Sequence, residues 1–279
     1  MAPLVRITSG MSQRHVLSDL RRVQERLAAA QDQVSSGKRV EKPSDDPLAA
    51  ERATRLRADL GSTAAYRTSV DDSTSWLDAT DSALDSLTQI VQRVRELTVQ
   101  ANNASTSTAG RQSIQAEIDQ LTEQAKATLN GAYDGRYLFS GTATNQPPYT
   151  AATGNAYLGD TGAVVRQIGP GVSVQVNVTA DDVLGTVKWL QSGDLSQIDA
   201  GLDNIVAKRS QIGAITNRVT AAGQRLDDLG DITTKLLSNT EDADLPQALI
   251  DLSSQQTALQ SALRGGATLI QQSLMDFLQ

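Results

Sequence analysis

The spacing of apolar residues at the two ends of the chain limits its fold more than any other feature. Near the start, apolar residues recur at every third or fourth position, and near the end they keep nearly the same rhythm. Narrow stripes of this kind are typical of helices that wrap around partner helices. The termini are therefore predicted to form coiled-coil arms, along Val16, Leu20, Val23, Leu27 and Val34 at one end, and Leu245, Leu249, Leu252, Leu259, Leu263, Ile270, Leu274 and Phe277 at the other.

The two arms carry opposite net charge. Residues 1–43 contain eight Lys and Arg against four Asp and Glu, whereas residues 241–279 contain one Arg against five acidic residues. This polarity favours packing the arms side by side, but ordinary variation between solvated helix faces explains it equally well. The basic excess is small and has no interleaved aromatic residues, which argues against nucleic-acid binding.

Helix-breaking residues predict where the N-terminal arm ends. A first helix is expected from about Met11 to Ser35, with Gly37 as its stop. Pro43 excludes the preceding residue from helical geometry, and Pro47 suits the first position of a new helix. Asp45 and Asp46 are expected to cap that helix.

Long helices are predicted on both sides of the middle of the chain. One runs from Leu48 to about Ala104, and a shorter antiparallel helix follows a Ser- and Thr-rich turn and ends at Asn130. A third long helix is expected from about Leu195, and a break over 239–246 separates it from the terminal helix.

The middle of the chain changes to a two-residue period. Val172, Val174, Val176 and Val178 alternate with polar residues, which is typical of a half-buried strand. Glycine and proline are frequent before this stretch. Residues 136–190 are therefore predicted to form a small β-rich insertion with several turns.

Together these patterns predict a mainly α fold with a β domain at its midpoint. The long helices are expected to form an antiparallel bundle between the terminal arms. The predicted parts are an N-terminal helical arm and break at 1–43, the outgoing part of the bundle at 44–135, the β-rich insertion at 136–190, the returning part of the bundle at 191–240, and a C-terminal helical arm at 241–279.

Composition gives little support to an enzyme. Cysteine is absent and His15 is the single histidine, so His/Cys metal sites and Cys-His pairs are excluded. No catalytic, cofactor-binding or metal site is predicted, and Trp76 and Trp189 are expected in cores or interfaces. No apolar run approaches the roughly 20 residues of a membrane helix, and no conventional signal peptide is recognisable at the start.

Several segments resemble the bacterial flagellin family. The stretches QRVRELTVQANN at 92–103 and RQSIQAEIDQLTEQ at 111–124 resemble the paired long helices of flagellins, and IGAITNRV at 212–219 and SNTEDADLPQAL at 238–249 resemble the returning helix and the break after it. Three further segments resemble the family members that join hook to filament, namely SSGKRVEKPSDDPLAA at 35–50, GRYLFSGT at 135–142 and SLMDFLQ at 273–279.

This resemblance implies a secreted structural protein of the extracellular flagellum that is not an enzyme. The implied partners are other copies of the chain in a ring, hook-associated protein 1, flagellin, the flagellar type III export apparatus and an export chaperone. Neither nucleic acid nor a membrane is implied. The arms would be disordered in the monomer and fold on assembly. Two alternatives are a short flagellin that builds the filament itself, and an enzyme site in residues 141–190.

The resemblance also implies a surface for an innate receptor. In flagellins a surface on the long helix is bound by toll-like receptor 5, and the matching positions are Arg93, Leu97 and Glu117. A structural role at the bundle surface explains these residues equally well.

Overall fold

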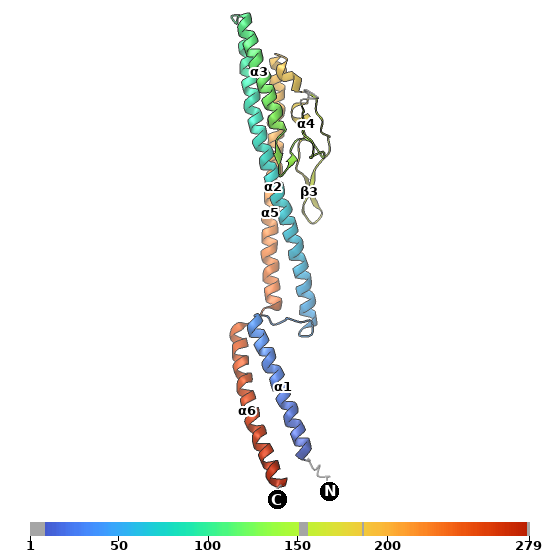
Figure 1. The fold of residues 1–279 in the computed structure, drawn as a ribbon, viewed down its shortest axis with the longest axis vertical. Helices are drawn as coiled ribbons and strands as arrows, with labels where there is room; N and C mark the ends of the chain where they lie inside the picture. Colours follow the sequence, from blue (N-terminus) through green and yellow to red (C-terminus); the bar gives the residue numbers. More distant parts are fainter. Residues whose placement is uncertain (1–8, 151–155, 186, 278–279) are drawn as a thin grey trace. The chain divides into compact units, whose positions relative to one another are not determined.

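The computed structural model describes residues 9–150, 156–185 and 187–277 (Figure 1). The chain divides into two compact units. The first unit consists of residues 1–60 and 232–279, and the second consists of residues 61–231. Two long helices, α2 (Pro47–Ala101) and α5 (Leu195–Glu241), contribute to both units.

The first unit is built around α1 (Ser9–Ser36) and α6 (Leu245–Phe277), which lie side by side and run in opposite directions (Figure 1). Helix α1 ends where Gly37 takes a φ of 69° and its N–H bonds to the Gln33 carbonyl. A left-handed conformation costs glycine little, so the helix stops here. Helix α2 begins at Pro47 as the sequence predicts, because Asp46 Oδ1 accepts the Ala49 N–H at 3.0 Å.

The break before α6 is shorter than the predicted 239–246. Thr240 still belongs to α5, and its hydroxyl donates to the Leu236 carbonyl one turn back. Pro246 lies in the first turn of α6, where a missing N–H removes no helical hydrogen bond. Asp244 caps that turn by accepting the Gln247 N–H, so only Asp242 to Asp244 separate the two helices.

The second unit is a helical bundle with one continuous core. Helix α3 (Thr108–Leu129) starts at an N-cap, where the Ser107 side chain accepts the Gly110 N–H. Each of the three helices buries a stripe at three- and four-residue spacing, which gives the bundle its core. The stripes include Leu77, Leu84, Leu87, Val91 and Val94 from α2, Ile118 and Leu129 from α3, and Ile198, Ile205, Ile212 and Val219 from α5.

Two antiparallel hairpins form the β part of the second unit. The first joins β1 (Ala132–Tyr133) to β2 (Arg136–Tyr137) through Asp134 and Gly135, both at positive φ. Two such residues in succession suit the tight turn of a hairpin, and Asp-Gly is a strong signal for it. The β structure therefore begins four residues before the predicted 136.

The second hairpin pairs β3 (Val165–Gly169) with β4 (Val172–Gln175). The predicted alternation holds over residues 172–176, where Ser173 and Gln175 are exposed and Val174 and Val176 are buried, but β4 ends at Gln175 and the predicted strand does not continue to Val178. Asn177 and Thr179 are buried, so the alternation is lost there. Two short helices, α4 (Ala180–Leu184) and η1 (Val187–Gln191), follow the strand and are absent from the sequence prediction. Helix α4 forms because Thr179 and Asp182 make a reciprocal capping box. The mainly helical fold with a small β insertion is confirmed.

Candidate assembly surface

The contact between α1 and α6 brings the two predicted arm stripes together. Val16 of α1 lies close to α6, because a Cβ built on Gly266 would lie 3.2 Å from Val16 Cγ1. The other stripe residues of α1, Leu20, Val23, Leu27 and Val34, are all half-buried. The pair of arms therefore covers one side of each stripe and leaves the other side open.

Several large apolar side chains of the arms remain exposed. Leu17 of α1 is 55% exposed and Ile250 of α6 is 63% exposed, and Leu245, Leu249 and Leu263 are each about half exposed. Leu252 and Leu259 are half-buried. Ile270, Leu274 and Phe277 belong to α6, but their side chains lie outside the described residues. Apolar area exposed along two adjacent helices is the feature expected of a surface that further helices cover.

Main-chain hydrogen bonds join the non-helical segment after α1 to the segment between α5 and α6, and these two segments form the base of the arms. The N–H groups of Arg39 and Val40 both donate to the Glu241 carbonyl, at 2.6 and 3.2 Å. In the opposite direction, the Ala243 N–H donates to the Gly37 carbonyl at 2.9 Å. The segment after α1 and the segment before α6 are thus paired like two short strands.

A buried carboxylate strengthens this connection. The Glu241 side chain is 7% exposed and forms ion pairs with Lys38, at 3.2 Å, and with Arg57 of α2. A buried charge is costly unless it is paired and hydrogen-bonded, so both cations are needed to hold Glu241 inside. The carboxylate therefore ties the segment after α1 to α2 and α5 within the first unit.

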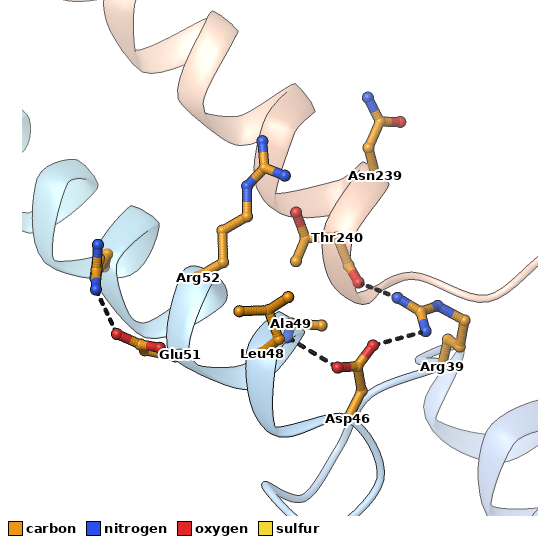
Figure 2. Close-up of a pocket in the computed structure, with 9 residues that line it drawn as sticks. Arg39, Asp46, Leu48, Ala49, Glu51, Arg52, Asn239 and Thr240 are labelled. Carbon is orange, nitrogen blue, oxygen red and sulfur yellow. Dashed lines mark hydrogen bonds and ion pairs between the residues drawn. The ribbon is translucent and has the colours of Figure 1, made fainter.

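A cavity of about 560 Å³ opens beside this connection (Figure 2). Arg39 lies on one side of it, where its guanidinium donates to the Thr240 carbonyl at 2.9 Å and to Asp46 at 3.4 Å. Arg52 extends between α2 and α5 and forms no ion pair with any described residue (Figure 2). Leu48 lines the same cavity and is largely exposed.

The two aspartates before α2 have different roles. Asp46 caps the helix as predicted, and the Ala49 N–H, followed by Arg39, lowers the pKa of Asp46 below its usual value. Asp45 does not cap α2, so that prediction is wrong. Its carboxylate accepts the N–H groups of Lys42 and Glu41 in the preceding loop, and these bonds lower the pKa of Asp45.

Comparison with known proteins decides the family. The model of the bacterial flagellin N-terminal helical region matches residues 7–144, and the model of the C-terminal helical region matches residues 195–278. The chain belongs to the flagellin family. Both matched regions lie outside most of the β insertion, and together they contain the two arms.

Relatives within the flagellin family include both junction proteins and flagellins. Flagellar hook-associated protein 3 of Escherichia coli is 29% identical over 56% of this chain and 49% of that protein, so the match spans about half of the relative. The Salmonella typhimurium protein of the same name is 27% identical over 66% of this chain and 58% of its own length. Flagellin FlaB1 of Treponema pallidum is 25% identical over 89% of this chain and 91% of its own.

Solved structures show the same flagellin-type fold. A putative flagellar hook-associated protein from Vibrio parahaemolyticus superposes with a TM-score of 0.64 at 20% identity, over 71% of this chain and all of that one. FlgL from Bacillus cereus gives a TM-score of 0.55 at 23% identity, over 66% of this chain and 99% of that one.

The three residues predicted to match a receptor surface, Arg93, Leu97 and Glu117, are not all on the surface of this chain. Arg93 of α2 forms an ion pair with Glu117 of α3 at 2.8 Å, and Glu117 followed by Glu96 raises the pKa of Arg93. Leu97 is buried in the bundle core. Arg93 and Glu117 thus lie together and connect α2 to α3.

Within residues 9–150, 156–185 and 187–277, no group of three His, Asp or Glu side chains is placed to hold a metal ion. No described helix is long and apolar enough to cross a membrane. The connection at Glu241 was missed by sequence reasoning, because nothing in the sequence pairs it with Arg57, which lies 184 positions away.

Proposed function

We propose that this chain is a structural subunit at the junction between the flagellar hook and the filament. It would form a ring that contacts hook-associated protein 1 on one side and flagellin on the other. Three features support the proposal: membership of the flagellin family, similarity to proteins named hook-associated protein 3, and the half-covered apolar stripes of α1 and α6. The half-covered stripes are the main support, because exposed apolar area along two adjacent helices favours association with further helices.

The energetics of the arms favour assembly. Two helices in contact bury only one side of each stripe, and most of the stability of a helix in a protein comes from packing its apolar face. Covering the exposed half of Leu17, Ile250 and their neighbours would add roughly 25 cal/mol for each Å² of apolar surface removed from water. Folding of the arms is therefore coupled to their association with neighbouring subunits, and the ordering cost is offset there.

The same proposal includes a route out of the cell. The chain would pass unfolded through the flagellar type III export apparatus, delivered by an export chaperone, and assemble outside the cell. The absence of cysteine is compatible with this route, since no thiol can cross-link during transit or in an oxidising exterior. Breaks as short as Asp242 to Asp244 leave long helices that can form again after transit.

A second candidate is a short flagellin that builds the filament itself. The observation that favours it is the extent of the match, because FlaB1 of Treponema pallidum aligns over 91% of its own length and hook-associated protein 3 of Escherichia coli over only 49%. The two candidates share the arms and differ in copy number and position along the flagellum.

Deletion of the gene separates the two candidates. A junction subunit predicts cells that carry hooks without filaments and shed unpolymerised flagellin into the medium. Electron microscopy of the cells and analysis of the secreted protein would show both features. Loss of the filament protein itself from cells and medium would favour the flagellin candidate, and normal filaments would contradict both.

A further inference from the structure

Two buried N–H groups in the second unit belong to residues that line one small cavity. Among the described residues, the buried side-chain nitrogen and oxygen atoms that lack a hydrogen-bond partner are Trp76 Nε1 and Arg166 Nε. Both residues line a cavity of about 160 Å³. A buried donor without an acceptor costs free energy, so native structures rarely keep two of them at one place.

Both donors are held in position by their neighbours. Trp76 of α2 is 3% exposed, and Tyr133 of β1 packs edge-on against its ring with 6.4 Å between the centroids. Arg166 of β3 is held through a different nitrogen of its guanidinium group, because Nη2 pairs with Asp72 of α2 at 2.8 Å. Neither N–H can turn toward another acceptor without breaking these contacts.

The rim of the cavity adds one charge of each sign. Asp134 at the tip of the first hairpin and Arg136 in its second strand line the cavity and are exposed. Neither forms an ion pair within the described part of the chain. The charge of Arg166 is already balanced by Asp72. An incoming group therefore meets the two inner N–H donors, the cation Arg136 and the anion Asp134.

These features select the chemistry of the ligand. The inner donors require an acceptor, and a carboxylate offers two oxygens with one negative charge that Arg136 can balance. Asp134 at the rim repels any anion, and it repels a phosphate more strongly than a carboxylate because a phosphate carries more negative charge. The volume is several times the roughly 30 Å³ of a single water, so a carboxylate on a short carbon stem fits.

We propose that the cavity between α2, the first hairpin and β3 is a binding site for a carboxylate group. Trp76 Nε1 and Arg166 Nε donate to its oxygens, and Arg136 balances its charge. The carboxylate comes either from an Asp or Glu side chain of another copy of this chain or from a small free acid. The site belongs to the second unit and does not depend on the junction function proposed above.

Nuclear magnetic resonance of the full-length chain tests this proposal through its two indole N–H signals. Trp189 serves as an internal reference, because its Nε1 already donates to the Leu184 carbonyl at 2.6 Å. Acetate is titrated at constant ionic strength against chloride. We expect the Trp76 signal to shift and saturate while the Trp189 signal stays in place.

Two variants assign the effect to the cavity. Arg166→Lys keeps a positive charge near Asp72 but removes the Nε donor, and we expect acetate to bind at least tenfold more weakly. Arg209→Lys is the matched control, because Arg209 also pairs with aspartates of α2, Asp81 and Asp85, and does not line the cavity. Its acetate affinity should equal that of the unmodified chain.

Two titrations distinguish the source of the carboxylate. One varies the acetate concentration and the other varies the protein concentration. A Trp76 shift that follows acetate at fixed protein concentration assigns the site to a small free acid. A shift that follows protein concentration in acetate-free buffer assigns it to a side chain of a second copy. If neither titration moves the Trp76 signal, the cavity holds water and the proposal is wrong. An equal shift with phosphate or with acetamide would also overturn the carboxylate assignment.

Discussion

Glu241 shows how one side chain supports the base of the arms. Its carbonyl accepts two N–H groups of the segment after α1, and its buried carboxylate pairs with Lys38 and Arg57. The main-chain pairing and the ion pairs therefore stabilise the same contact. Removing the charge should loosen the main-chain pairing as well.

The substitution Glu241→Gln tests this coupling. We expect the amide hydrogens of Arg39 and Val40 to exchange about tenfold faster, equivalent to about 1.4 kcal/mol, because both cations lose their partner. Hydrogen exchange followed by mass spectrometry measures the change. Glu51→Gln is the control, because Glu51 pairs with Arg55 on the exposed surface of α2 and its loss should be nearly neutral. Equal exchange in both variants would contradict the role of Glu241.

The caps before α2 predict a dependence on pH. Because the folded state lowers the pKa of Asp46 below 3.8, the carboxylate stabilises the folded chain above pH 3.8, and this contribution is lost as the pH falls through the lower folded value. Carboxyl-carbon magnetic resonance should give titration midpoints below 3.8 for both Asp46 and Asp45. A midpoint at or above 3.8 for Asp46 would show that the cap is not formed.

At the scale of elements, the stripes on the long helices separate core from surface. Ile205 and Val206 are neighbours on α5, yet Ile205 is completely buried and Val206 is 53% exposed. We expect Ile205→Ala to lower the free energy of unfolding of the second unit by about 2 to 4 kcal/mol, because it leaves a cavity in the bundle core. Urea denaturation measures this value.

Val206→Ala provides the matched control for that experiment. Its side chain faces away from the core, so its removal should change the unfolding free energy by about 0.5 kcal/mol or less. Similar losses in the two variants would mean that the stripe on α5 is assigned to the wrong face.

The return of the chain from the β insertion depends on a close approach of η1 to α5. A Cβ built on Gly201 would lie 2.2 Å from the Trp189 ring, so no larger residue fits there without moving the indole. We expect Gly201→Ala to lower the melting temperature and to shift the fluorescence of Trp189. Gly213→Ala is the control, because a Cβ at Gly213 meets no atom within 4 Å. Alanine is a better helix former than glycine, so the melting temperature of Gly213→Ala should be unchanged or slightly higher.

The elements that follow from local chemistry were predictable from the sequence. The stop at Gly37 and the start at Pro47 depend on backbone preferences of single residues, and the long helices depend on a repeated spacing. Helices α4 and η1 were not predicted, because each is only five residues long and too short to show a period. The first hairpin is signalled by Asp134-Gly135, but its strands have two residues each.

The candidate surface was predictable only in part, for a related reason. Apolar spacing identifies the stripes of α1 and α6, since the helical period is local. Spacing cannot show that Leu17 and Ile250 stay exposed after the arms meet, because this depends on how the two helices are rotated. Neither the pairing of Glu241 with Arg57 nor the cavity at Trp76 has a sequence signal, since their residues are far apart in the chain.

At the scale of the whole molecule, the two units predict separable roles. The second unit has its own core, which contains Trp76 and is contacted by Trp189. We expect removal of residues 245–279 to leave a folded monomer with unchanged near-ultraviolet circular dichroism, since both tryptophans lie in that unit. The truncated chain should fail to enter flagella. Loss of the tryptophan signal on truncation would contradict the independence of the second unit.

The central claim is that neighbouring subunits cover the exposed side of the arms, and thiol labelling tests it most directly. The chain contains no cysteine, so Leu17→Cys supplies a single thiol on the exposed side of α1. Its rate of reaction with a bulky maleimide should be compared between the isolated chain and the chain incorporated in flagella, with denatured samples as the reference for complete labelling. We expect rapid labelling of the isolated chain and at least tenfold slower labelling after incorporation. Equal rates in the two states would show that the arms do not form the contact between subunits.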